Sequence, residues 1–305
     1  MPPLYDVAVV GAGPAGLSAA LTLGRGRRRV LLLDDDHPRN APAANAWGFI
    51  TRDGVPPDEL RSLGRAELDR YDVDVQDGHV DSAERTADGF RLCLTDGGTV
   101  ESRALVLATG IADVLPDVPG MREAWGEGVV HCPYCHGWDY RDRPTAFYGA
   151  GDDAFEMGRF LTLWTDTLTV VSDGPADLTP DQRAELDARG VAVDERRVGR
   201  IEQDDGHVRA VVFEDGGRLS VEAVYVKPEV RPRSGLAESL GAHALPSRIL
   251  VTDEVGRVEG VPLLFLAGDT TEKQHQVSLA VASGTRAAFA LNHDLLVADT
   301  PKEAV

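Results

Sequence analysis

Two cysteines, two residues apart, form the most reactive pair of side chains in the sequence. Cys132 and Cys135 stand in the run His131-Cys132-Pro133-Tyr134-Cys135-His136-Gly137, and the only other cysteine of the 305 residues is Cys93. A Cys-x-x-Cys pair either closes a reversible disulfide or holds a metal. A structural zinc site needs four ligands, usually in two spaced pairs, and the sequence has no second pair. The spacing therefore favours redox chemistry, with Cys132 and Cys135 as the reacting sulfurs.

A histidine directly follows the second cysteine. Oxidation of a dithiol moves protons as well as electrons, and the ordinary pKa of histidine, near 6.5, suits proton transfer at neutral pH. The alternative is that His136 only hydrogen-bonds the local backbone. We expect His136 to handle protons beside the cysteine pair. Cys93 lies between two leucines of an apolar segment, so we expect a buried structural thiol there.

A glycine-rich turn near the N-terminus predicts a dinucleotide site. A buried strand at 5–10 runs into Gly11-Ala12-Gly13-Pro14-Ala15-Gly16, then a helix to about Leu23 and a second strand that ends in Asp34. In this arrangement the first glycine permits the tight turn, the second admits a pyrophosphate, and the third lets the helix pack on the strand. The helix N-terminus faces the phosphate charge. The predicted binding residues are Gly11, Gly13, Pro14, Ala15, Gly16 and, for a ribose hydroxyl, Asp34.

The same pattern recurs in the middle of the chain. A strand at 145–148 leads into Gly149-Ala150-Gly151, a helix to about Trp164 and a strand at 168–171, so the sequence contains an internal repeat. Proline-rich breaks stand at 116–120 and 228–232. The other expected elements are a helix at 57–71, an antiparallel meander at 73–106, a buried strand at 104–110, strands at 208–214 and 219–226, a strand at 263–269 and a helix from Gln276 to Leu296. These elements predict an α/β chain with two Rossmann-like, three-layer ββα dinucleotide-binding domains.

Composition narrows the range of partners. The formal net charge is −19 and the pI about 4.7, which disfavours nucleic acid and anionic membranes because both attract basic surfaces. No apolar run reaches the length of a membrane span, and the first ten residues lack the pattern of a secretory signal. Three cysteines are too few for a secreted disulfide framework. We therefore expect a cytoplasmic protein whose cysteine pair cycles.

The ordered set of motifs resembles the thioredoxin reductase family over nearly the whole chain. The set comprises both glycine turns, the Cys-x-x-Cys pair, Ala108-Thr109-Gly110 and Gly268-Asp269. The resemblance implies FAD as cofactor, an FAD-binding domain formed by residues 1–114 and 236–305, an inserted domain at 115–235, and a homodimer. It adds a second group of FAD-binding residues: Arg39, Ala108, Thr109, Gly110, Gly268, Asp269, Gln276 and Val277.

Within that family, Cys-Pro-Tyr-Cys-His-Gly looks most like the dithiol oxidases that close disulfides in small metabolites of the gliotoxin and holomycin type. Ordinary reductases carry an acid where His136 stands. This likeness implies a small-molecule dithiol as substrate and O₂ as acceptor. It also implies that Cys135 faces the flavin and Cys132 exchanges with substrate. A helix beginning near Cys135 would stabilise its thiolate.

The nicotinamide partner is the main point left open. NADPH-using relatives place paired arginines just after the second strand of the inserted domain, whereas Asp173 and Asp177 stand here before the first basic residue, Arg183. Carboxylates would repel a 2′-phosphate, so the sequence disfavours NADPH but leaves NADH open. Two alternatives to the oxidase remain: an NAD(P)H-dependent reductase of a thioredoxin-like protein, and a flavoprotein without turnover that acts as a redox-responsive binding module.

Overall fold

The apolar N-terminal strand, β1 (Tyr5–Val10), lies at the centre of the largest sheet in the computed structural model, which describes residues 5–300. The strand order is β3-β2-β1-β6-β5-β4. β1 pairs in parallel with β2 and β6, and the long β6 pairs antiparallel with β5 along its first half and parallel with β17 along its second. The bounds are β2 (Val30–Asp34), β3 (Val73–Asp77), β4 (Val80–Arg85), β5 (Phe90–Leu94), β6 (Thr99–Leu107) and β17 (Leu264–Leu266).

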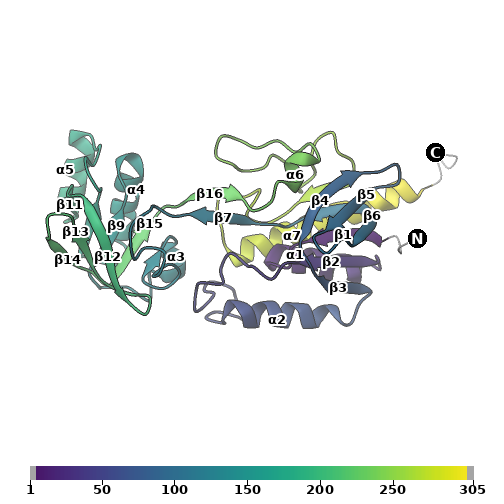
Figure 1. The fold of residues 1–305 in the computed structure, drawn as a ribbon, viewed down its shortest axis with the longest axis horizontal. Helices are drawn as coiled ribbons and strands as arrows, with labels where there is room; N and C mark the ends of the chain where they lie inside the picture. The colour runs from purple at the N-terminus through teal and green to yellow at the C-terminus, as the bar shows by residue number, and fades with distance from the viewer. Residues whose placement is uncertain (1–4, 301–305) are drawn as a thin grey trace.

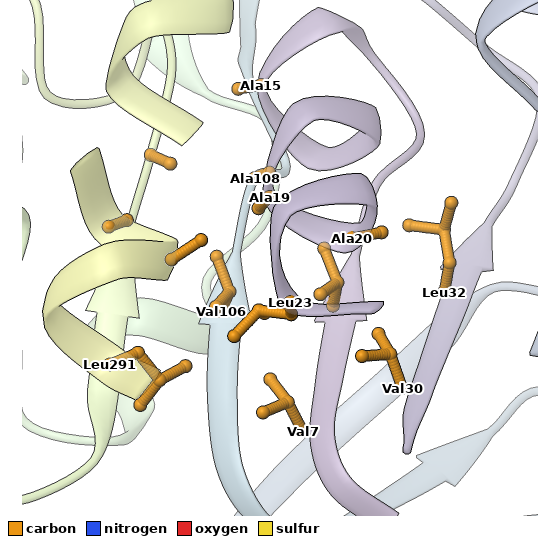
Figure 2. Close-up of a cluster of buried hydrophobic side chains, with 14 of the residues drawn as sticks. Val7, Ala15, Ala19, Ala20, Leu23, Val30, Leu32, Val106, Ala108 and Leu291 are labelled. Carbon is orange, nitrogen blue, oxygen red and sulfur yellow. The ribbon is translucent and has the colours of Figure 1, made fainter. Parts of the chain in front are cut away.

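Two helices cover one face of this sheet. They are α1 (Pro14–Arg25) and α7 (Val277–Asp299), and α2 (Pro57–Leu68) lies beside α1. Figure 2 shows Leu23 of α1 and Leu291 of α7 meeting Val106 in the core. The helices approach so closely that a Cβ on Gly284 would lie 2.0 Å from the carbonyl oxygen of Ala15. Glycine at 284 is therefore required by the contact between the first and the last helix. On the other face, α6 (Leu236–Ser239) joins a second apolar core.

The inserted domain has a smaller sheet of entirely parallel strands, in the order β11-β10-β9-β15-β8. A separate antiparallel sheet, β12-β13-β14, packs against it. The strands are β8 (Val129–Val130), β9 (Thr145–Tyr148), β10 (Leu168–Val171), β11 (Ala192–Asp194), β12 (Val198–Asp204), β13 (His207–Phe213), β14 (Arg218–Ser220) and β15 (Ala223–Val226). The helices are α3 (Pro133–His136), α4 (Gly151–Leu161) and α5 (Pro180–Ala188).

A two-stranded ribbon connects the two domains (Figure 1). It consists of β7 (Ile111–Val114) and β16 (Glu229–Pro232), which pair antiparallel. The chain thus leaves the FAD-type domain along β7 and returns beside its own exit along β16. Four residues of the segment 228–232, which was expected to be a break, form the strand β16 (Glu229–Pro232). Pro228 precedes the strand and Pro232 ends it, so neither proline interrupts it.

The sheet expectations were right in type and wrong in two pairings. β3 is not part of an antiparallel meander but pairs in parallel with β2, because the α2 crossover returns the chain in the same direction. The segment 219–226 is not one strand: β14 belongs to the antiparallel sheet, and β15 lies inside the parallel one. All four residues of β15 are buried, as both faces of such a strand require. The strands β7, β8, β11 and β12 were not predicted.

Cys93 is not the buried thiol that its neighbours predicted. Leu92 and Leu94 are buried on one face of β5, and strand alternation points Cys93 to the other face, where it is half-exposed. Within residues 5–300, no helix combines the length and apolar character that a bilayer crossing requires.

Candidate active site

The three glycines of the N-terminal turn have three different surroundings. Gly11 has φ +101°, and a Cβ there would lie 2.4 Å from the carbonyl oxygen of Ala108. A Cβ on Gly16 would lie 1.7 Å from the carbonyl oxygen of Gly11. Gly13 has no atom within 4 Å of a Cβ position, so its free side opens on a cavity. Gly11 and Gly16 hold the turn against the helix, whereas Gly13 leaves room for a ligand.

That cavity collects nearly all of the predicted site residues. Its lining includes Gly11, Gly13, Pro14, Ala15, Asp34, Arg39, Ala108, Thr109, Gly110, Cys135, His136, Gly268, Asp269, Gln276 and Val277. Gly16 and Cys132 are the exceptions. Gly16 packs the helix on the turn, and Cys132 stands outside the cavity lining while its partner Cys135 is inside it.

The cavity fits an anionic dinucleotide. The helices α1 and α7 both begin at it, neither has a side-chain cap, and neither carries an acid in its first turn. Their first N–H groups are therefore available to accept negative charge, which is the donor set that a pyrophosphate and a reduced flavin need. FAD would be held by α1 and Gly13 at its pyrophosphate and by Gln276 and Val277 at its flavin end.

Asp34 ends β2 at this cavity, as expected for a ribose-binding acid, but it also has protein partners. Its Oδ1 accepts from the Ala12 N–H at 2.8 Å, and its Oδ2 accepts from Arg61 at 2.7 Å and Arg65 at 2.8 Å. Burial alone would raise the pKa of Asp34, but these donors outweigh it and hold the pKa below its usual range. A ribose hydroxyl would share Oδ1, which keeps one lone pair.

A buried ion network fixes Arg39, which the resemblance assigned to the cofactor. Its guanidinium binds Asp113 in a bidentate manner at 2.9 and 2.7 Å and Asp269 at 2.9 Å. The side chain of Asp113 is 6% exposed and belongs to β7. Burial lowers the pKa of Arg39, but the two carboxylates more than compensate and keep it charged. The network ties the connecting ribbon to the FAD-type domain.

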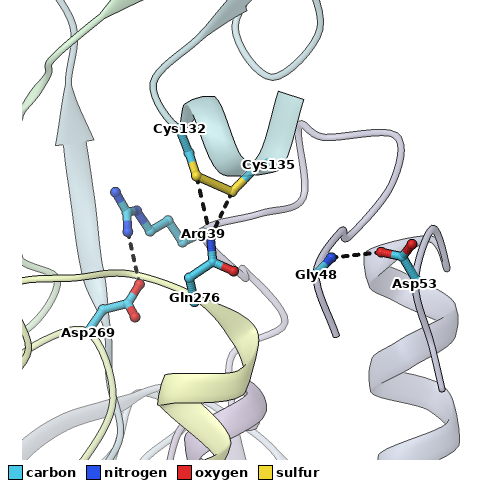
Figure 3. The surroundings of a disulfide bond; sticks show 7 residues. All are labelled: Arg39, Gly48, Asp53, Cys132, Cys135, Asp269 and Gln276. Atoms are coloured by element: carbon cyan, nitrogen blue, oxygen red, sulfur yellow. Dashed lines mark hydrogen bonds and ion pairs between the residues drawn. A yellow bond between two sulfur atoms is a disulfide. The ribbon is translucent and has the colours of Figure 1, made fainter. Parts of the chain in front are cut away.

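Cys132 and Cys135 form a disulfide across the short helix α3. Figure 3 shows that the side-chain amide of Gln276, at the start of α7, points at both sulfurs. The Gln276 Nε2 lies 3.2 Å from the Sγ of Cys135 and 3.4 Å from the Sγ of Cys132. The helix was expected to begin near Cys135. It begins instead at Pro133, because proline is suited to the first helical position, and Cys132 is the N-cap residue.

Three histidines surround the disulfide, and burial lowers the pKa of each. For His131, burial and then the Arg39 guanidinium lower the pKa to about 4, and its ring stacks on Trp125 at 5.5 Å between centroids. Burial lowers the pKa of His136, partly offset by Asp139. The Nδ1 of His136 is buried and has no hydrogen-bond partner among the described residues. Burial also lowers the pKa of His275. All three imidazoles are therefore neutral at pH 7 and able to accept a proton.

Sequence reasoning missed Arg61, Asp113 and Trp125, which also line the cavity. Arg61 and Arg65 stand four residues apart on α2, so helical periodicity could have shown that they share a face. Asp113 and Trp125 had no such signal. They lie about a hundred residues from the first glycine turn in the sequence, and only the folded chain brings them to the same cavity.

Comparisons with known proteins identify the family. A family model described as pyridine nucleotide-disulphide oxidoreductase matches residues 5–284. A thioredoxin reductase of Claviceps purpurea is 31% identical over 292 residues, covering 92% of this chain and 91% of that protein. One of Leptosphaeria maculans is 30% identical, covering 98% and 96%. The crystal structure of HlmI matches with a TM-score of 0.92 and 39% identity over 97% of this chain and 94% of that one. The chain therefore belongs to the pyridine nucleotide-disulphide oxidoreductase family, as a thioredoxin reductase-like, FAD-dependent disulfide oxidoreductase.

Proposed function

We propose that this protein is a dithiol oxidase that closes an intramolecular disulfide in a small molecule and passes the electrons to O₂. The main support is the placement of Cys135 and His136 in the same cavity as the flavin-end residues. The His136 imidazole is neutral at pH 7, because burial lowers its pKa, and it can accept a transferred proton. The Cys-Pro-Tyr-Cys-His-Gly motif, which resembles that of the gliotoxin- and holomycin-type oxidases, points the same way.

The chain's residues can carry the exchange as follows. One substrate thiolate attacks the Sγ of Cys132, the Cys132–Cys135 bond breaks, and Cys135 leaves as a thiolate. The second substrate thiolate attacks the substrate sulfur of the mixed disulfide, and Cys132 leaves in turn. His136 accepts a substrate proton. FAD, when bound, would accept the two electrons of the reduced cysteine pair and pass them to O₂. The net reaction converts a dithiol and O₂ to a cyclic disulfide and H₂O₂.

The second glycine turn supports this direction of electron flow because it is poorly suited to a nicotinamide dinucleotide. Asp173 follows β10, where a ribose-binding acid belongs; its Oδ1 accepts from the Val198 N–H and its Oδ2 from the Tyr148 hydroxyl, both at 2.8 Å, which leaves it as able to accept from a ribose as Asp34 is. The first turn of α4 carries Asp152 and Asp153, at the position where α1 and α7 carry no acid. Asp153 is paired with Lys227, whereas Asp152 would repel a pyrophosphate at that helix end.

One arginine does lie near the ribose end. The guanidinium of Arg197 donates to the backbone carbonyl oxygen of Asp173 and lies 3.6 Å from the side-chain carboxylate of the same residue. The Arg197 side chain is 63% exposed. It could contact a 2′-phosphate. Arg196 is held instead by Asp194. The alternative function, an NAD(P)H-dependent thioredoxin reductase, is favoured by the names of the relatives from Claviceps purpurea and Leptosphaeria maculans.

We also propose a homodimer, supported by the outer side of α7. Leu279, Phe289 and Leu296 are 37%, 65% and 61% exposed and lie along one side of this helix. A second copy of the chain would cover them. Phe289→Glu should halve the mass measured by light scattering if α7 forms the interface, and an unchanged mass would exclude it.

The oxidase reading is tested with the FAD-loaded protein in air. Small dithiols, beginning with dithiothreitol, should drive oxygen uptake and H₂O₂ formation, whereas Cys135→Ser should abolish both. A monothiol such as 2-mercaptoethanol is the matched control, because it cannot complete the intramolecular step. Rapid anaerobic flavin bleaching by NADH or NADPH, without dithiol-driven oxygen uptake, would favour the reductase. Failure to turn over with any dithiol or nucleotide would favour the binding module.

A further inference from the structure

The side chain of Gln276 has no structural task within its own domain. Gln276 is the N-cap residue of α7, yet its side chain does not cap that helix. Its amide nitrogen instead donates across the domain boundary to the two sulfurs of α3, at 3.2 and 3.4 Å (Figure 3). The amide oxygen faces Gly48, where a Cβ would come within 3.5 Å of it. Gly48 in turn has φ +75° and donates its N–H to Asp53 at 2.8 Å.

A disulfide sulfur is a weak acceptor, and a thiolate is a strong one. The contact therefore strengthens when the disulfide opens and negative charge forms on sulfur. Among the described residues, Gln276 is the only one whose side chain donates to either sulfur. The nearby titratable groups are His131, His136 and His275, together with the Arg39–Asp113–Asp269 network. All three histidines are neutral at pH 7, and the network, with one guanidinium and two carboxylates, supplies no positive charge to the sulfur.

We propose that Gln276 is a catalytic residue whose amide N–H stabilises the thiolate that leaves Cys135 when a substrate thiolate attacks Cys132. A better-stabilised leaving thiolate departs faster, so the amide would accelerate opening of the disulfide by substrate. The same contact would keep Cys135 deprotonated for electron transfer within the cavity. This inference deepens the proposed function but needs only its thiol–disulfide step, which an oxidase and a reductase share.

The test measures the pKa of the Cys135 thiol directly. In a Cys93→Ser, Cys132→Ser background only Cys135 can react, and its rate of alkylation by iodoacetamide is followed against pH. Gln276→Met removes the donor while keeping the length of the side chain. A hydrogen bond to a charged group is strong enough that its loss should raise the thiol pKa by about one to two, which lowers the alkylation rate roughly 10- to 100-fold at pH values below the wild-type thiol pKa. Gln76→Met, on the exposed strand β3, is the matched control and should change nothing.

Gln276→Glu gives a second, signed readout, because a carboxylate beside the sulfur should raise the thiol pKa above that of the Met variant. The same ordering should appear in the pH midpoint of thiolate–flavin absorbance, which does not depend on turnover. If the pKa of the Cys135 thiol is the same in proteins with Gln276, Gln276→Met and Gln276→Glu, the proposal is wrong. Neither result depends on O₂ or on the identity of the substrate, so the proposed oxidase activity could fail while this inference stands.

Discussion

Gln276 and Cys135 belong to different domains, yet the amide nitrogen of one lies 3.2 Å from the sulfur of the other. Because Gln276 is the N-cap residue of α7 and also lines the cavity, this contact places the Cys135 sulfur at the part of the cavity where α7 begins. The two domains are therefore arranged for electron transfer between the cysteine pair and the cavity. The predictions below test the cavity, the sulfurs, the second glycine turn and the buried histidine.

Gly13→Val should abolish FAD binding and leave the fold of the FAD-free protein intact. A side chain at 13 meets no protein atom but occupies the space proposed for the pyrophosphate. Far-UV circular dichroism checks that the fold is intact, and flavin absorbance after reconstitution checks that FAD does not bind. Gly16→Val is the contrasting control: its Cβ would collide with the Gly11 carbonyl, so it should impair folding itself. A Gly13→Val protein that retains FAD with wild-type affinity would show that the pyrophosphate binds elsewhere.

Cys132→Ser should leave a persistent thiolate–flavin absorbance band, and Cys135→Ser should remove it. The reason is that Cys135 lines the cavity whereas Cys132 does not. Visible spectra of the two FAD-loaded variants provide the measurement, and both variants should lose dithiol oxidation. The reverse pattern of bands would exchange the roles of the two sulfurs.

NADPH should be a poor electron donor to the flavin. Each guanidinium contact to a 2′-phosphate contributes on the order of 1–3 kcal/mol, so the absence of two would weaken binding roughly 30-fold to 25,000-fold. Among residues 5–300, Arg197 is the one guanidinium paired with the Asp173 carboxylate, and that carboxylate would repel a phosphate. Stopped-flow mixing under nitrogen should show slow reduction that Arg197→Ala does not change. Fast reduction that saturates at micromolar NADPH and is lost in Arg197→Ala would contradict this prediction.

His131 should make folding stability depend on pH between about 6.5 and 4. Burial lowers its folded-state pKa to about 4, so in this window the unfolded chain binds a proton that the folded protein does not. Stability is therefore complete above pH 6.5 and falls as the pH drops, by about 2 kcal/mol at pH 5.

Urea unfolding at pH 7.5 and pH 5 tests this dependence. The loss between the two pH values should be about 2 kcal/mol smaller in His131→Gln than in wild type. His207→Gln, on β13, serves as the exposed control. Equal losses in His131→Gln and wild type would show that His131 does not titrate as its burial implies.

Local patterns were enough to predict the two glycine turns, because strand, turn, helix and acid follow one another within about thirty residues. The sequence also placed Gln276 at the start of the last helix. It could not show that the Gln276 side chain reaches Cys135, since that contact forms only when two domains meet. Asp113 was missed for the same reason, as it is identified only by its ion pair with Arg39. The prediction of a buried Cys93 was wrong for a different reason, because a short apolar run does not reveal which face of a strand is buried.

The close contact between Gly284 and Ala15 has a consequence for synthesis of the chain. Because α7 and β17 complete the domain that β1 and α1 begin, the whole inserted domain is translated before α1 can be covered. At about 5–20 residues per second, the roughly 250 residues between α1 and α7 take on the order of 10–50 s. Throughout that interval the apolar side of α1 lacks its partner on the nascent polypeptide. The inserted domain is thus free to fold before the domain formed by the two ends of the chain is complete.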